Sequence, residues 1–170
     1  TSEAVYMDML KTVFNAGIPG AELHIDNLKG IEGEIGLRVG EEEYFGVINV
    51  GDDTQLIKLC DKNGLLTETR EFSKSLFRNL DEESSSINVL IGSKKFTEGW
   101  NSWRVSTMGL LNIGRSESPE VIQLFGRGVR LKGYQLSLKR SSRLEDINEK
   151  QIPKMIKSVE TLNIFGVRAD

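Results

Sequence analysis

Apolar and polar positions in the first third of the chain predict a helix, a small β meander and a second helix. Residues 3–14 place apolar side chains at helical spacing, and the glycine-rich segment 17–20 ends that pattern. Glycines and an acidic run then separate three short extended segments, residues 21–28, 33–39 and 44–50. Asp52 and Asp53 are suitable N-terminal caps for the next helix, which we expect to end near Lys62. We expect Leu56, Ile57 and Cys60 to lie on its inner side.

The rest of the chain has a pattern typical of strands alternating with helices and loops. Residues 71–80 predict a further helix, and residues 152–165 predict a final one. Residues 87–91 and 105–113 are nearly continuous apolar runs, typical of strands buried on both faces of a parallel sheet. The polar loop between them, residues 92–104, has the position at which open α/β sheets bind ligands. These elements predict an α/β fold with a mainly parallel sheet flanked by helices and a small N-terminal β meander.

Length and composition favour one domain. The chain has 170 residues, of which 38% are hydrophobic and 28% charged, which suits one hydrophobic core. We therefore expect a single domain over residues 1–170, with residues 21–50 as a candidate small β insertion. The single cysteine, Cys60, and the absence of an apolar run of roughly 20 residues favour a cytoplasmic protein with no membrane partner. Because no initiator methionine is present, the chain is expected to be excised from a longer parent.

Charge is distributed unevenly along the chain. Residues 94–143 contain ten Lys/Arg and three acidic residues, whereas the remainder contains 12 basic and 22 acidic residues. A local excess of this size is a candidate contact for phosphate, from nucleotide or nucleic acid, although a solvated face would have the same composition. The only histidine, His24, has no nearby cysteine or second histidine, so we expect no metal site.

The segment Ser118 to Arg130, SPEVIQLFGRGVR, predicts a helix with one polar stripe. Ser118 is expected to cap it and Pro119 to occupy its first position. At about 100° per residue, Arg127 lies about 40° and Arg130 about −20° from Gln123. The opposite arc holds the apolar side chains that we expect to pack on a sheet: Val121, Ile122, Leu124, Phe125 and Val129.

Two glycines in this helix require a reason, because each costs about 1 kcal/mol relative to alanine in a helix interior. Gly126 lies beside the arginine stripe, where it leaves room for a ligand or partner backbone. Gly128 lies on the packed side, where it permits close contact between helix and sheet. The simpler alternative is an amphipathic surface helix whose arginines lie in water.

The same helix carries a family resemblance. QLFGRGVR matches the QxxGRxxR form of motif VI of superfamily 2 helicases. The preceding loop resembles motif V, because an apolar strand leads into Ser93, with Gly99 and Asn101 six and eight positions later. Residues 87–143 as a whole resemble the Res subunit of type III restriction endonucleases and related DEAD/DEAH-box proteins. Many relatives carry Asp at the position of Asn101.

The resemblance implies the second RecA-like lobe of a two-lobe, ATP-dependent DNA helicase or translocase. ATP and Mg²⁺ would lie between the lobes, with Arg127 and Arg130 acting as arginine fingers on the γ-phosphate. Gln123 would help to close the nucleotide interface. Gly99 would let the backbone approach the nucleotide, and Asn101 would lie near its ribose.

The resemblance also implies partners. Ser93, Lys94, Lys95 and Thr97 would contact the nucleic-acid backbone without reading base identity. The N-terminal RecA-like lobe of the same parent, DNA and a modification (methyltransferase) subunit are the expected partners. No GxxxxGK[ST] segment is present, so ATP and Mg²⁺ would be held mainly by the other lobe and the isolated chain would be inactive.

Two other functions fit the residues. One is a non-catalytic nucleic-acid-binding module with a helicase-like fold. The other is an interaction domain in which Arg127 and Arg130 bind a protein carboxylate or a small phosphorylated ligand.

Overall fold

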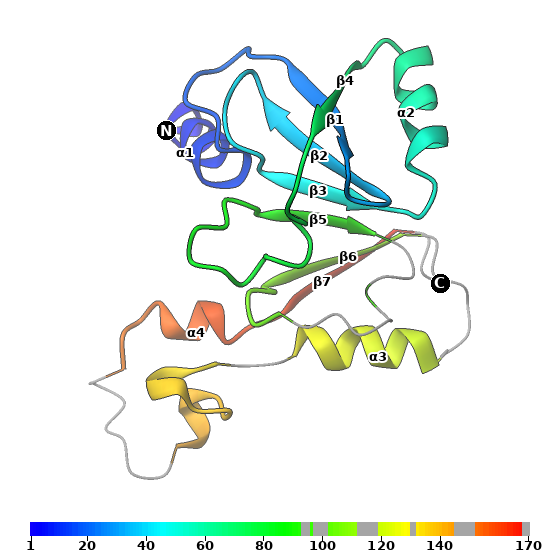
Figure 1. Cartoon of the computed structure of the whole chain (residues 1–170). Coiled ribbons are helices and arrows are strands. Elements are labelled where there is room, and N and C mark those ends of the chain that lie inside the picture. The colour runs from blue at the N-terminus through cyan, green and yellow to red at the C-terminus, as the bar shows by residue number, and fades with distance from the viewer. Residues whose placement is uncertain (93–95, 97–101, 112–118, 130–131, 145–151, 168–170) are drawn as a thin grey trace. The chain divides into compact units, whose positions relative to one another are not determined.

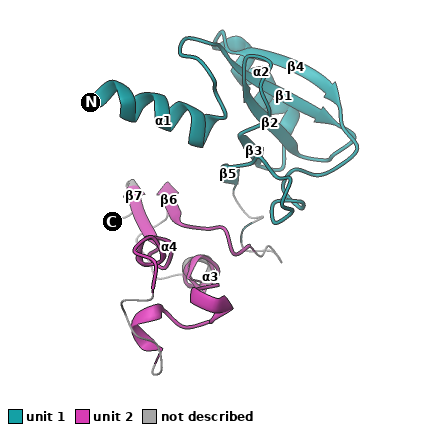
Figure 2. Cartoon of the chain, turned by 90° about the vertical axis from the view of Figure 1, so that its left-hand side faces the viewer, with its two compact units in different colours: residues 1–98 teal, residues 99–170 magenta. Residues whose placement is uncertain are grey.

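The chain forms two compact units, Thr1–Glu98 and Gly99–Asp170, in a computed structural model (Figures 1 and 2). The structure describes residues 1–92, 96, 102–111, 119–129, 132–144 and 152–167. The expected single domain over residues 1–170 stays a prediction, and each unit is described by itself below.

The first unit is a five-stranded sheet with two helices. Its elements are α1 (Ser2–Phe14), β1 (Leu23–Lys29), β2 (Glu34–Val39), β3 (Gly46–Asn49), α2 (Asp53–Lys62), β4 (Leu66–Glu71) and β5 (Val89–Gly92). The strand order is β4-β1-β2-β3-β5. The pairs β1–β2 and β2–β3 are antiparallel, whereas β4 pairs with β1 and β5 with β3 in parallel. The fold is therefore α/β, as predicted, but this sheet is mixed rather than mainly parallel.

The expected meander is confirmed, and it forms the centre of the sheet. Its three strands begin and end within a few residues of the predicted bounds. Gly30, in the β1–β2 turn, has a φ of 101°, and a β-carbon there would lie 2.6 Å from the carbonyl oxygen of Phe72. Only glycine combines this left-handed backbone with so close an approach of the chain that follows β4.

One face of the sheet packs against α2 to form the core. The buried members are Ile25, Ile35, Leu37, Phe45 and Cys60, joined by the partly buried Phe14, Val39, Ile48, Leu56, Ile57 and Val89. The Asp52 carboxylate caps α2, because its Oδ1 accepts a hydrogen bond from the Gln55 amide at 2.9 Å. Both the cap and the predicted inner face of this helix are confirmed.

The second unit contains two strands and short helices. Its elements are β6 (Thr107–Leu111), α3 (Pro119–Gly128), the 3₁₀ turns η2 (Tyr134–Leu136) and η3 (Ser141–Arg143), α4 (Ile156–Val159) and β7 (Asn163–Val167). The strands β6 and β7 are parallel and pair Thr107 with Asn163 through Leu111 with Val167. Figure 1 shows α3 and α4 as separate helices joined through the turns of residues 132–144.

Two predicted helices are wrong. Residues 71–80 form the end of β4 and a series of turns. The buried carboxylate of Glu34 accepts hydrogen bonds there from the Ser75 hydroxyl and from the Leu76 amide at 3.0 Å, which holds the turn. Within residues 152–165 only α4 is helical, and the segment beginning at Asn163 is a strand because its apolar residues pair with β6.

The predicted strand at residues 87–91 is present as β5, but the expectation of burial on both faces is wrong within its unit. The strand lies at the end of the strand order, and Ile91 is exposed.

In the described part of the chain, no helix is both long and apolar enough to cross a membrane.

Candidate functional site

The candidate site is the helix α3, which carries the residues that resemble motif VI. It begins at Pro119, as predicted, and has Arg127 in its last turn. Proline suits this position because the first amides of a helix have no intrahelical acceptor, so the missing N–H costs nothing. Ser118, the expected cap, lies outside the described residues.

Gly128 packs α3 tightly within the second unit. A β-carbon at Gly128 would lie 2.5 Å from the Sδ of Met108, on β6, and 2.9 Å from Cδ2 of Leu162, just before β7. Real β-carbons essentially never approach other atoms so closely. The prediction that Gly128 permits close contact between helix and sheet is confirmed.

Gly126 has the opposite surroundings. Apart from its own helix backbone, no heavy atom of the described residues lies within 4 Å of the position that its β-carbon would take. It is exposed, as is Gln123, and Arg127 is partly buried. The space predicted beside the stripe is therefore present at Gly126. Arg130, the third member of the stripe, lies outside the described residues.

The packed side of α3 is narrower than predicted. Leu124 and Phe125 are partly buried, but Ile122 and Val129 are 63% and 60% exposed. The helical angle explains the difference: Gly128 marks the centre of the contact, and Ile122 and Val129 lie about 100° or more from it. Their predicted packing is wrong within this unit, and they flank the contact instead.

The remaining predicted residues lie in the loop between β5 and β6. Ser93, Lys94, Lys95, Thr97, Gly99 and Asn101 are all outside the described residues. Phe96, within the same loop, is described. Its ring lies 5.7 Å from that of Phe77, and a β-carbon at Gly92 would lie 2.7 Å from its Cε2. An aromatic contact therefore joins Phe96, which is partly buried, to the buried Phe77 within the first unit.

A cluster of charged side chains on the other face of the first sheet was not predicted. We call it the β1–β4 ion cluster: His24, Asp26, Arg38, Glu41, Tyr44, Glu68 and Arg70. At its centre, Arg38 Nε donates to Asp26 Oδ2 at 2.7 Å, and both side chains are buried, at 1% and 0% exposure. Arg38 Nη2 also donates to Glu68 Oε2 at 2.8 Å. The cluster therefore joins β1, β2 and the edge strand β4.

Outer members complete the cluster. The hydroxyl of Tyr44 donates to Asp26 Oδ2 at 2.9 Å, and Arg70 Nε lies 3.3 Å from the same oxygen. Burial, followed by the hydrogen bond and the charge of Asp26, raises the pKa of Tyr44 to about 12. Hydrogen bonding from Arg70 and the charge of Arg38 lower the pKa of Glu41.

Three members of the cluster have the donor types of a metal site. One ligand atom each from His24, Asp26 and Glu68 lies within 4.8 Å of the others. The guanidinium of Arg38 lies among them, however, and donates to both carboxylates. Arg38 therefore supplies the positive charge that a metal ion would otherwise bring, and we assign the cluster to the stability of the sheet.

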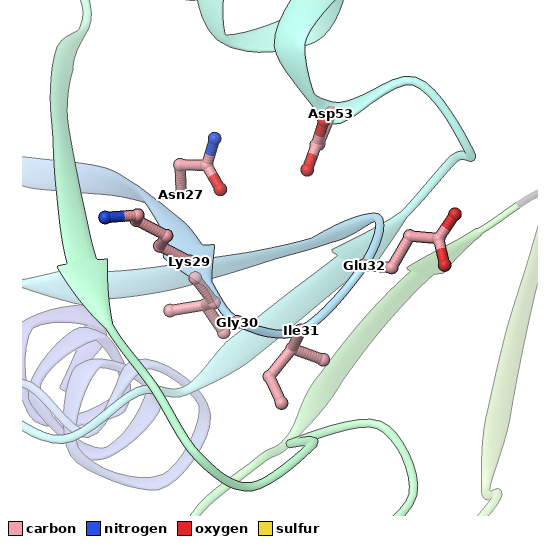
Figure 3. Close-up of a pocket in the computed structure, with 7 residues that line it drawn as sticks. Asn27, Lys29, Gly30, Ile31, Glu32 and Asp53 are labelled. Carbon is pink, nitrogen blue, oxygen red and sulfur yellow. The ribbon is translucent and has the colours of Figure 1, made fainter.

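A pocket of about 380 Å³ lies where β1 ends and α2 begins (Figure 3). Its lining residues are Asn27, Leu28, Lys29, Gly30, Ile31, Glu32 and Asp53. Figure 3 shows Asn27 and Asp53 on facing sides, while Lys29 points away and pairs with Glu71 at 2.6 Å. The pocket contains none of the residues that the sequence assigned to nucleotide or nucleic acid.

No protein-family model, no curated protein and no solved structure matches the chain. The assignment of the site therefore depends on the sequence motifs and on the geometry of α3.

Proposed function

We propose that the chain is the C-terminal, RecA-like motor lobe of an ATP-dependent DNA helicase or translocase, similar to the Res subunit of type III restriction endonucleases. The observation that carries the proposal is the pair of glycines in α3. Gly128 is required for packing on Met108 and Leu162, whereas Gly126 leaves open space next to Arg127. A surface helix that only kept its arginines in water would still need Gly128 for packing but would not need Gly126.

In this proposal Arg127 and Arg130 are catalytic in the complete motor. Their guanidiniums reach the γ-phosphate of ATP and stabilise the charge that develops on it during phosphoryl transfer. Gln123, exposed one turn before Arg127, closes the nucleotide interface. Gly99 and Asn101 approach the nucleotide from the motif V loop. ATP and Mg²⁺ are held mainly by the N-terminal lobe.

Nucleic acid is the second ligand of the proposed lobe. Ser93, Lys94, Lys95 and Thr97 follow β5 and offer hydroxyl and ammonium groups to backbone phosphate. Parallel pairing of β5 with β3 and of β6 with β7 supports a RecA-like arrangement, although the first sheet as a whole is mixed. A methyltransferase subunit is a further proposed partner.

Complementation tests this proposal. The chain alone should show no ATP hydrolysis, because it has no phosphate-binding GxxxxGK[ST] loop. Adding the N-terminal lobe of the parent should produce turnover that DNA stimulates. Turnover by the chain alone that Arg127→Ala abolishes would contradict the half-site proposal. DNA binding that persists while the two lobes together never hydrolyse ATP would favour the non-catalytic binding module.

A further inference from the structure

A second basic segment lies outside the proposed helicase motifs. We call residues 132–144, between α3 and α4 (yellow to orange in Figure 1), the basic leucine loop. Two of its leucines, Leu136 and Leu138, are 72% and 75% exposed. The loop contains no acidic residue. Its four cationic side chains are all exposed: Lys132, Lys139, Arg140 and Arg143. Exposed apolar side chains that form one contiguous patch mark an interaction site, and these two leucines lie two positions apart on one loop.

The loop is closed by its own backbone hydrogen bonds. The Gly133 amide donates to the Ser137 carbonyl at 2.8 Å, and the Leu136 amide donates to the Gly133 carbonyl at 3.0 Å. Gly133 is buried, and a β-carbon there would lie 3.0 Å from the carbonyl oxygen of Lys139. The chain therefore returns on itself at Gly133, and both leucines lie between Gly133 and Lys139.

A buried polar contact anchors the base of the loop. The Ser141 amide donates to Glu160 Oε1 at 2.8 Å, and the Ser141 hydroxyl donates to Oε2 at 2.7 Å. Both residues are buried. The carboxylate of Glu160, at the end of α4, is thus used to hold the loop, and its two oxygens both accept hydrogen bonds from Ser141.

The backbone at the tip is strained. Gln135 and Leu136 have φ values of 53° and 62°. Residues other than glycine, asparagine and aspartate rarely adopt this left-handed backbone conformation. Backbone strain of this kind is concentrated at functional sites. The left-handed conformation of Leu136 lowers the stability of the fold, and burial of its side chain does not compensate, because that side chain is exposed.

We propose that the basic leucine loop is a nucleic-acid contact in which Leu136 and Leu138 lie against bases while the flanking cations bind phosphates. Apolar side chains that enter between bases, with cations on the adjacent backbone, are a general mode of nucleic-acid binding. The proposal extends the nucleic-acid partner of the proposed function to a second surface. It requires neither ATP nor the motif V loop.

Substitution at the tip tests the base contact. Leu136→Asn in the 170-residue chain removes the apolar side chain, and asparagine tolerates positive φ, so the melting temperature should stay equal or rise. Combined with Leu138→Ser, it should weaken binding to a fluorescent 20-nucleotide single strand by about tenfold. Leu59→Ser, at another exposed leucine on α2, is the matched control and should bind like the unmodified chain.

A base analogue separates contact with bases from contact with phosphate. The unmodified chain should change the emission of 2-aminopurine placed in the strand or at a duplex fork, and the leucine variant at saturating concentration should not. Lys139→Ala/Arg140→Ala should instead reduce the slope of log affinity against log salt by about 1.4 on single strands.

Three results would overturn the proposal. One is equal affinity and equal 2-aminopurine response for the leucine variant and the unmodified chain. The second is leucine-dependent binding to phosphatidylserine vesicles with no binding to DNA, which would assign the loop to an anionic membrane. The third is leucine-dependent binding to a protein in place of DNA. None of these depends on ATP hydrolysis, so failure here leaves the test of the two-lobe motor separate.

Discussion

The Cα of Gly128 faces the side chain of Met108 so closely that a β-carbon would lie 2.5 Å from the methionine sulfur. Two residues earlier, apart from its own helix, no heavy atom of the described residues lies within 4 Å of the position that a β-carbon at Gly126 would take. The two glycines of one helix therefore have different surroundings: Gly128 lies in a tight packing contact, and Gly126 does not.

Alanine substitutions should separate these two functions. Gly126→Ala should raise the free energy of unfolding by up to about 1 kcal/mol, because it removes a flexible residue from a helix. Gly128→Ala should lower it by about 1 to 2 kcal/mol, because Met108 and Leu162 must both move. Urea unfolding of the two variants measures both values. A stabilising Gly128→Ala would show that the contact with β6 is not tight.

The buried pair of Asp26 and Arg38 should dominate the stability of the first unit. Arg38→Ala leaves the carboxylate of Asp26, which is 0% exposed, without its main partner. The expected loss is about 3 to 5 kcal/mol in the free energy of unfolding. Lys29→Ala, which removes the exposed pair with Glu71, is the control and should change stability little. Similar losses in both variants would contradict the assignment of the cluster to stability.

The pKa of Tyr44 predicts an alkaline limit on stability. Burial and Asp26 raise this pKa to about 12, whereas an unfolded tyrosine titrates near 10. Between these values the unfolded chain has released the proton and the folded chain retains it, so stability should fall as pH rises from about 10 to 12. Tyr44→Phe should remove this part of the pH dependence. Chemical unfolding of both proteins across the range measures it, and identical slopes would show that Tyr44 does not carry it.

Lys94 and Lys95, in the loop that resembles motif V, should bind nucleic acid without sequence preference. Lys94→Ala/Lys95→Ala should lower affinity for unrelated DNA sequences by the same factor and weaken its dependence on salt. Fluorescence anisotropy at two salt concentrations checks this. Losses confined to one sequence, or none at low salt, would count against contact with phosphate.

Much of the fold could be predicted where local signals are strong. The cap at Asp52 and the apolar spacing of Leu56 and Cys60 predicted α2 and its buried face, and both are confirmed. Pro119 predicted the start of α3 in the same way. These signals depend on neighbouring residues alone, so the sequence contains them in full.

Elements that depend on distant partners could not be predicted so well. The strand β4 reads LTETRE and has no apolar face, because it is an edge strand whose Glu68 and Arg70 belong to the ion cluster. Its parallel pairing with β1 is a property of the tertiary structure. The helical spacing of residues 152–165 likewise gave way to pairing of β7 with β6.

The candidate site was predicted in part for the same reason. Helical angles alone placed Gly126 and Gly128 correctly on two sides of α3. The buried pair of Asp26 and Arg38 was not predicted, because it depends on the β1–β2 register, in which Asp26 pairs with Gly36 and His24 with Arg38. The missed signal was an acidic and a basic residue at alternating positions of two adjacent strands.

The most direct test of the proposed motor lobe is DNA-stimulated ATP hydrolysis by the two-lobe parent carrying Arg127→Ala or Arg130→Ala. Each change should lower kcat by about 10³ to 10⁵, because a guanidinium on the γ-phosphate acts mainly in the transition state. Melting temperature and DNA affinity should stay nearly unchanged, and Arg78→Ala, at an exposed arginine of the first unit, should keep full activity. A variant of Arg127 or Arg130 that retains full ATP hydrolysis, or that unfolds, would contradict the assignment of that arginine as a finger.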